Sequence, residues 1–365
     1  MDQDILEKAI RLRHEIHLHP ELSGCETETK RRLTAFLREN TALAVVDRGL
    51  WFYAKYSAKR PARKAIAFRA DFDAIREDEG AAHRCGHDGH ASALAAFAAE
   101  VDRKGLDRDV YFIFQHGEET GIGGKPASML LKEEPVAEIY AIHNFPGAPL
   151  GSVNTRAGTL CFASTGVSMV FSGVAAHAST PELGKNPARA ISEIVGALDG
   201  LAARNGRRGK AFATVVQIAV GEEAFGISAG EGKLLLTVRG EIQEEYDALM
   251  RDIRQLAQEK ADAYGLKLKT EYHDPFPETC NHESCVEKIR AVCREKGFSY
   301  VEMKEPLRTS EDFGYFTQNA PGAMVWLGSG EQTAPLHSKD FDYPDPLIEY
   351  SVALFWALAQ AIDES

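Results

Sequence analysis

The sequence lacks the features that mark secreted, membrane and nucleic-acid-binding proteins. It has only six cysteines in 365 residues, too few for a disulfide framework. No apolar run approaches the roughly 20 residues that cross a bilayer, and residues 1–15 alternate charged with apolar side chains, unlike a signal peptide. Positive charge is also scarce: the net charge is −12, which disfavours contact with nucleic acid or anionic membranes. We therefore expect a cytoplasmic protein that binds neither.

The chain is long enough for two domains. At 365 residues it exceeds the size at which one hydrophobic core stops growing. Its 44% hydrophobic and 26% charged residues are typical of a globular protein. An Ala-rich stretch, 89–101, predicts a buried helix, and apolar runs at 64–70, 109–115 and 138–143 predict buried strands. This alternation of strands and helices predicts an α/β architecture.

The middle of the chain has a different pattern. Its expected elements follow the order β-α-β-β-α-β of a ferredoxin-like sandwich. They are 166–173, 187–203, 212–220, 233–241, 244–264 and 267–273. We predict a discontinuous α/β domain, residues 1–160 plus 275–365, interrupted by an inserted domain, residues 161–274.

Acidic and histidine side chains follow the predicted strands. Asp71 and Asp73 come after the first strand, Glu118-Glu119 follows the second, and His143 ends the third. Ligands of open α/β sheets gather outside the carboxyl ends of the strands, so we expect these side chains to meet. Adjacent carboxylates repel each other unless a cation is present, and then one can bind metal while the other takes a proton.

Two further segments carry metal-binding side chains. Cys85 and His87 flank Gly86 just before the predicted buried helix, so both side chains can turn toward one point. Thiolate and imidazole are good ligands for zinc and similar divalent metals. A third candidate, His337, lies in the loop after a strand expected at 322–328. These segments strengthen the prediction of a metal site.

Each candidate has a plainer explanation when taken alone. A single histidine after a strand is more often a hydrogen-bonded structural residue, and a single cysteine is more often an inert buried thiol. Five such groups at the ends of elements in one domain favour a metal site instead. We expect His14, His17 and His19, on or just after the first helix and next to Pro20, to be structural.

Six segments together resemble one protein family, the amidohydrolase branch of the aminoacylase and metallo-carboxypeptidase superfamily. They are Arg69-Ala-Asp-Phe-Asp-Ala74, Cys85-Gly-His-Asp-Gly-His90, residues 115–119, Ala176-His-Ala-Ser179, Ser310-Glu-Asp-Phe313 and Pro335-Leu-His-Ser338. Hippurate hydrolases, N-acetyl-amino-acid deacetylases, auxin-conjugate hydrolases and aminobenzoyl-glutamate hydrolases belong to this branch. The resemblance implies a zinc-exopeptidase-like mixed-sheet catalytic domain with an inserted α+β domain that serves as a lid and dimerisation domain.

The resemblance also implies a set of roles. Two divalent ions, Zn²⁺ or Mn²⁺ with Co²⁺ or Ni²⁺ as alternatives, would be held by Cys85, His87, Glu119, His143 and His337. Glu118 would be the general base, and Asp71, Asp73 and Glu311 would support the ligands through hydrogen bonds. His177 would stabilise the oxyanion, in its own subunit or in a partner's, and Arg239 would bind the substrate carboxylate. A homodimer through the inserted domain is implied as well.

The chain departs from its relatives in four places. Arg76 stands where relatives usually have proline, and His116-Gly117 replaces their Pro-Ala before the glutamate pair. Residues 226–230 replace a stretch that usually contains asparagine, and Leu236 replaces a common glycine. The metal site is therefore expected to be complete, whereas the substrate-contacting lid is altered.

We predict an amidohydrolase that cleaves the amide bond of N-acyl amino acids or related conjugates, with a small molecule as its binding partner. Two alternatives remain open. A dipeptidase could use the same metal site if it recognised a free amino terminus. A non-catalytic metal-binding paralogue is disfavoured because Glu118 is present.

Overall fold

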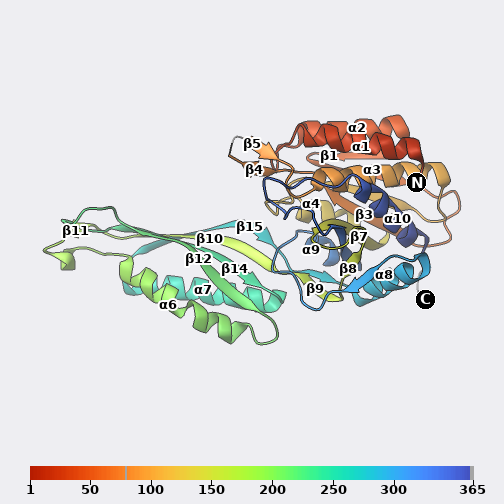
Figure 1. Ribbon diagram of the computed structural model, residues 1–365. Coiled ribbons are helices and arrows are strands. Elements are labelled where there is room, and N and C mark those ends of the chain that lie inside the picture. The colour runs from red at the N-terminus through yellow and green to blue at the C-terminus, as the bar shows by residue number, and fades with distance from the viewer. Residues whose placement is uncertain (79, 362–365) are drawn as a thin grey trace. The chain divides into compact units, whose positions relative to one another are not determined.

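The chain forms two compact units in the computed structural model, which describes residues 1–78 and 80–361 (Figure 1). The first unit takes in Met1–Leu160, Thr279–Glu305 and the described chain from Asp312 onward. The second takes in Cys161–Glu278 and Pro306–Glu311. The expected inserted domain was 161–274. The short segment after Pro306 groups with the second unit because Phe162 N donates to the carbonyls of Leu307 at 3.2 Å and Thr309 at 3.0 Å.

The first unit is built on an eight-stranded mixed sheet, which confirms the predicted α/β class. The strand order is β1-β2-β6-β3-β7-β18-β8-β17. The strands are β1 (Ala44–Arg48), β2 (Trp51–Tyr56), β3 (Ala65–Asp71), β6 (Val110–Gln115), β7 (Val136–Pro146), β8 (Val153–Thr155), β17 (Tyr300–Glu302) and β18 (Gly322–Gly330). β3 pairs in parallel with β6 and β7, and β7 with β18, so their carboxyl ends meet at one edge.

Helices and short strand pairs complete the first unit. The helices are α1 (Gln3–His17), α2 (Thr27–Asn40), α3 (His87–Lys104), α4 (Gly124–Ser128), α5 (Leu130–Glu133), α8 (Glu283–Lys296), α9 (Gly314–Thr317) and α10 (Pro346–Gln360). Two short antiparallel ladders join β4 (Ile75–Glu77) to β5 (Gly80–Ala82), and β9 (Gly158–Cys161) to β16 (Thr279–Asn281). Figure 1 shows α1 and α2 side by side over α3.

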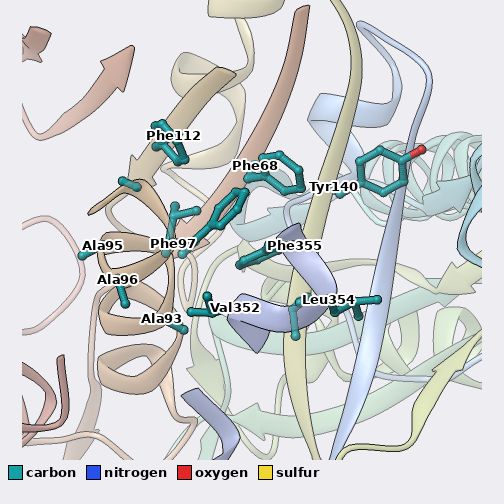
Figure 2. Packing of buried hydrophobic residues seen from close by; sticks show 14 of the residues in the cluster. Phe68, Ala93, Ala95, Ala96, Phe97, Phe112, Tyr140, Val352, Leu354 and Phe355 are labelled. Carbon is teal, nitrogen blue, oxygen red and sulfur yellow. The ribbon is translucent and has the colours of Figure 1, made fainter. Parts of the chain in front are cut away.

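The core between α3, α10 and the sheet fixes where α3 begins. Phe68 of β3 lies with its ring centroid 5.0 Å from Phe97 of α3 and 5.0 Å from Phe355 of α10 (Figure 2). Small side chains such as Ala93 and Ala96 let α3 pack closely against its neighbours. A buried, tightly packed α3 holds His87, its first residue, in a fixed place.

The second unit is a four-stranded antiparallel sheet in the order β12-β14-β10-β15. Its elements are β10 (Ala163–Ser172), α6 (Ala188–Asn205), β12 (Ala211–Val220), β14 (Glu231–Gly240), α7 (Gln243–Ala263) and β15 (Lys267–Phe276). Both helices lie on one face of the sheet (Figure 1), which together with the strand order is the ferredoxin-like arrangement. A two-residue pair, β11 (Ala176–His177) and β13 (Ile227–Ser228), and a 3₁₀ turn at Pro181–Leu183 complete it.

Within residues 1–78 and 80–361, no helix combines the length and the apolar character needed to cross a membrane.

Candidate metal centre

Four segments of the first unit bring metal-binding side chains together. They are the start of α3 with Cys85 and His87, the turn after β6 with Glu118 and Glu119, β7 with His143, and the loop after β18 with His337. His143 was expected at the end of its strand, but β7 continues to Pro146. The strand is longer than its apolar run because β18 pairs with it as far as Gly330.

The donor atoms of these segments lie within reach of one another. Cys85 Sγ is 3.5 Å from His143 Nε2. Glu119 Oε1 lies between two imidazoles, 3.7 Å from His87 Nε2 and 3.5 Å from His337 Nε2. The structure therefore gathers all five side chains that the sequence analysis named as ligands.

Hydrogen bonds orient two of the imidazoles toward the cluster. His87 donates from Nδ1 to Asp73 Oδ1 at 2.9 Å, and His143 donates from Nδ1 to the Asn144 carbonyl at 2.9 Å. Both rings thus present Nε2 to the cluster. Among the described residues, His87 Nε2 and Glu119 Oε1 are buried without a hydrogen-bond partner. Buried polar atoms are rarely left in this state, so a pair of divalent metal ions fits these residues.

The charges around the cluster favour a cation. Burial opposes protonation of His87, but Asp71 and Asp73 outweigh it and raise the pKa of His87 to about 10. Burial, followed by the charges of Glu119 and Glu118, raises the pKa of the Cys85 thiol well above its usual value. The protein surroundings therefore hold protons where ligands would bind metal, and a divalent ion would displace them.

Backbone geometry fixes the two ends of the cluster. Gly86 has φ +98°, and a Cβ there would collide with the side chain of Asn144, so only glycine fits between Cys85 and His87. His337 also has a left-handed backbone, with φ +63°, which is strained for a residue other than glycine. Its N–H donates to the Arg84 carbonyl at 2.7 Å, which ties this loop to the segment of Cys85.

Asp71 and Asp73 have different partners. Asp73 bonds directly to the candidate ligand His87. Asp71 instead accepts from Arg69 Nη1 at 2.6 Å and bonds His90 Nδ1 at 2.6 Å. Burial opposes ionisation of Asp71, but His87, Arg69 and His90 together lower its pKa well below the usual value. Asp71 is thus part of a charged network beneath the ligands.

Asp312, which the sequence alone did not identify, anchors that network. Its carboxylate accepts from Arg69 Nη2 at 2.7 Å, from Gln115 Nε2 at 2.8 Å and from Gly124 N at 2.6 Å. Its own N–H lies 3.4 Å from Glu118 Oε1. Asp312 lies beside Glu311 in one of the six segments that carried the family resemblance, so that segment was the signal that could have identified it.

Three predicted residues belong to the second unit. Arg239 donates from Nη1 to the Arg308 carbonyl at 2.7 Å and to Ser310 Oγ at 3.0 Å. His177 is exposed, and its Nδ1 accepts from the Ser179 N–H at 3.2 Å. Glu311 is buried and closes the segment that starts at Pro306.

The histidines of the first helix have structural partners. His17 Nδ1 lies 2.8 Å from Asp88 Oδ2, and His14 Nε2 lies 2.8 Å from Asp345 Oδ2. His17, Asp88 and Asp342 form a second group of side chains of the metal-binding type. The positively charged Arg13 guanidinium already lies 3.4 Å from Asp88 and 2.5 Å from Asp342, so the charge of these carboxylates is balanced by a side chain.

Comparisons with known proteins found a matching family model, similar curated proteins and a similar solved structure. The model of the peptidase family M20/M25/M40 matches residues 67–361. An N-acetyldiaminopimelate deacetylase of Lacticaseibacillus casei (strain BL23) is 29% identical over 92% of both chains. An N-acetylcysteine deacetylase of Bacillus subtilis (strain 168) is 25% identical over 100% of this chain and 99% of the relative. A crystal structure of a dinuclear metal-binding M20 peptidase of Bacillus subtilis superposes with a TM-score of 0.81 at 23% identity, covering 98% of each chain.

Proposed function

The chain belongs to the peptidase family M20/M25/M40, and from that premise we propose that it is a metal-dependent amidohydrolase that removes the acyl group from N-acyl amino acids. The observation that carries the proposal is a single cluster in which a thiol, three imidazoles and a carboxylate converge beside a second carboxylate, Glu118. Relatives named as deacetylases of N-acetyldiaminopimelate and N-acetylcysteine support an N-acetyl amino acid as the substrate.

In this proposal the five ligands are Cys85, His87, Glu119, His143 and His337, and they hold two divalent ions. Such ions polarise a carbonyl oxygen and lower the pKa of water from about 15.7 to about 7, so hydroxide is available at neutral pH. A thiolate ligand favours zinc, and manganese, cobalt or nickel are the alternatives.

Glu118 is the proposed general base. Its Oε2 lies 3.9 Å from His87 Nε2, at the cluster, while its Oε1 lies 3.4 Å from the backbone N–H of Asp312. One oxygen is thus held by the protein and the other faces the ligands. From this place Glu118 takes the proton of the attacking water and then delivers it to the leaving amine.

Arg239 is the proposed contact for the substrate carboxylate. Its guanidinium donates hydrogen bonds to two neutral oxygens, and in the part of the chain that the structure describes no carboxylate pairs with it. Burial lowers the pKa of its guanidinium, because the charge is partly desolvated without compensation. A bound carboxylate would supply that compensation.

The second unit supplies the remaining parts of the proposal. His177 stabilises the oxyanion, from its own subunit or from a partner's, and one such donor is typically worth roughly 3 to 4 kcal/mol of barrier. Its Nδ1 is engaged by Ser179, which leaves Nε2 as the donor. Glu311 supports the site, and the unit joins two copies into a homodimer.

A cytoplasmic location is part of the proposal. All six cysteines are free thiols, and a reducing compartment would keep them so.

A substrate panel on metal-loaded protein tests the function. We expect release of free amino acid from N-acetyl or N-benzoyl amino acids and no cleavage of dipeptides with a free amino terminus. Faster cleavage of dipeptides would replace the proposal with a dipeptidase. Absence of cleavage across the panel with each of the four metals would contradict an amidohydrolase.

A further inference from the structure

Glu26 is a buried carboxyl outside the ligand cluster, and it touches the turn that carries Glu118. Its side chain is 2% exposed, and its Oε1 accepts from Gly117 N at 2.7 Å. On the other side of Glu118, Asp73 Oδ2 accepts from Glu119 N at 2.9 Å. The peptide groups on both sides of the proposed base are therefore held by carboxylates of other segments.

The turn is tight and begins at a glycine. Gly117 has φ +60°, and a Cβ on it would lie 2.5 Å from Ile122 Cγ1, so glycine is required there. The Gly117 carbonyl accepts from Ile122 N at 3.0 Å and from Gly123 N at 3.2 Å. A glycine peptide has the widest conformational freedom of any residue, so the direction of its N–H depends on an external partner.

The segment just before Glu26 is bound to the chain that follows β3. This segment forms a parallel bridge with that chain, where Ala74 N donates to the Glu21 carbonyl at 2.9 Å. Ser23 Oγ donates to Asp73 Oδ2 at 2.7 Å, the same oxygen that accepts from Glu119. The two anchors of the turn are thus joined to each other through this segment.

We propose that Glu26 is a positioning residue for the general base, acting through the Gly117 peptide to hold the turn of Glu118; this rests on the proposed function. Burial and the neighbouring charge of Asp73 raise the pKa of Glu26 to about 7. A carboxyl oxygen can accept the Gly117 N–H in either protonation state. The turn therefore requires a hydrogen-bond acceptor at this distance from Gly117 and does not require a negative charge.

Three substitutions of Glu26 separate the effect of its side-chain length from the effect of its negative charge. Glu26→Gln keeps the length and an acceptor oxygen, Glu26→Asp keeps the acid but shortens its reach, and Glu26→Ala removes the acceptor. Glu39→Ala, on the exposed end of α2, is the matched control. Metal-loaded proteins are compared for kcat and KM on an N-acetyl amino acid, for metal per chain, and for hydrogen exchange of the Gly117 amide.

We expect Glu26→Gln and Glu39→Ala to match the unsubstituted chain. Glu26→Asp and Glu26→Ala should lower kcat about 10- to 100-fold, because a misplaced catalytic group loses rate at this scale. Their KM and metal content should stay unchanged, and their Gly117 amide should exchange faster. A structural defect alone would lower metal content or folded protein instead.

The inference is overturned if Glu26→Ala keeps kcat and amide protection, or if Glu26→Gln is as impaired as Glu26→Ala. If Glu26→Ala does not fold, the contrast between Glu26→Asp and Glu26→Gln decides. If the unsubstituted chain cleaves no substrate, the proposed function fails, and the amide exchange of the same variants still decides whether Glu26 holds the turn.

Discussion

Asp73 accepts a hydrogen bond from His87, with 2.9 Å between Oδ1 and Nδ1. This bond fixes the ring direction of His87, so Nε2 faces Glu119. Asp73 thus directs His87 toward the other candidate ligands.

Replacing Asp73 should weaken metal binding. Asp73→Ala removes the orienting bond to His87 while leaving every ligand in the chain, so metal affinity should fall about 10- to 100-fold. Chelator competition measures it. Asp47→Ala, an exposed aspartate, is the control and should bind as before. Unchanged affinity in Asp73→Ala would contradict the orienting role.

Removing the thiol should lower the number of bound ions. Cys85→Ala deletes a ligand whose sulfur lies 3.5 Å from His143 Nε2, so elemental analysis should find fewer than two metal ions per chain. Cys280→Ala removes an exposed cysteine and should leave the content unchanged. Full metal occupancy in Cys85→Ala would count against Cys85 as a ligand.

Metal loading should release protons. Burial alone would lower the pKa of His87, but the carboxylates of Asp71 and Asp73 outweigh it and raise this pKa to about 10. Burial also raises the pKa of the Cys85 thiol. Both groups therefore hold protons at neutral pH and must lose them to bind metal, so about two protons should leave per chain. Titration calorimetry in two buffers of different ionisation enthalpy measures this number.

The direction in which metal affinity changes with pH follows from the same competition between protons and metal. Because protons and metal compete below the pKa of His87, metal affinity should rise with pH across the neutral range. In Cys85→Ala the release should drop by about one proton. Binding heats that do not depend on the buffer would contradict the prediction.

Arg239 should act on substrate binding and not on metal. Arg239→Ala removes a charged donor, and such bonds contribute about 1.5 to 3 kcal/mol, so KM should rise about 10- to 100-fold at unchanged metal content. Arg207→Ala, in the same unit, is the control. An N-acyl amine without a carboxylate serves as the control substrate, and the two proteins should cleave it equally. An unchanged KM for N-acyl amino acids would remove Arg239 from the substrate site.

The parts of the fold that depend on local pattern could be predicted from the sequence. β3 and β6 were found because continuous apolar runs identify buried parallel strands. The end of β7 was misplaced because the polar residues His143 and Asn144 interrupt its apolar run, whereas pairing with β18 continues the strand to Pro146. The three-residue strands β8 and β17 are too short to show a pattern.

The parts of the site that depend on distant contacts could not be predicted. Cys85 and His87 were found because both occupy one short segment with a recognisable donor chemistry. Asp312 was missed because its role depends on Arg69, 243 residues away in sequence. Glu26 was missed for the same reason, since its partner Gly117 is 91 residues away. A carboxylate that holds a backbone N–H leaves no pattern in the sequence.

Release of free amino acid from an N-acetyl amino acid by Glu118→Gln protein tests most directly whether Glu118 acts as a base beside a metal pair. We predict that Glu118→Gln binds as much metal as the unsubstituted chain and that turnover falls by about 10²- to 10⁴-fold, because the proton acceptor is lost. The unsubstituted chain should lose activity to a chelator and regain it with added metal. Retained turnover in metal-loaded Glu118→Gln would contradict the account.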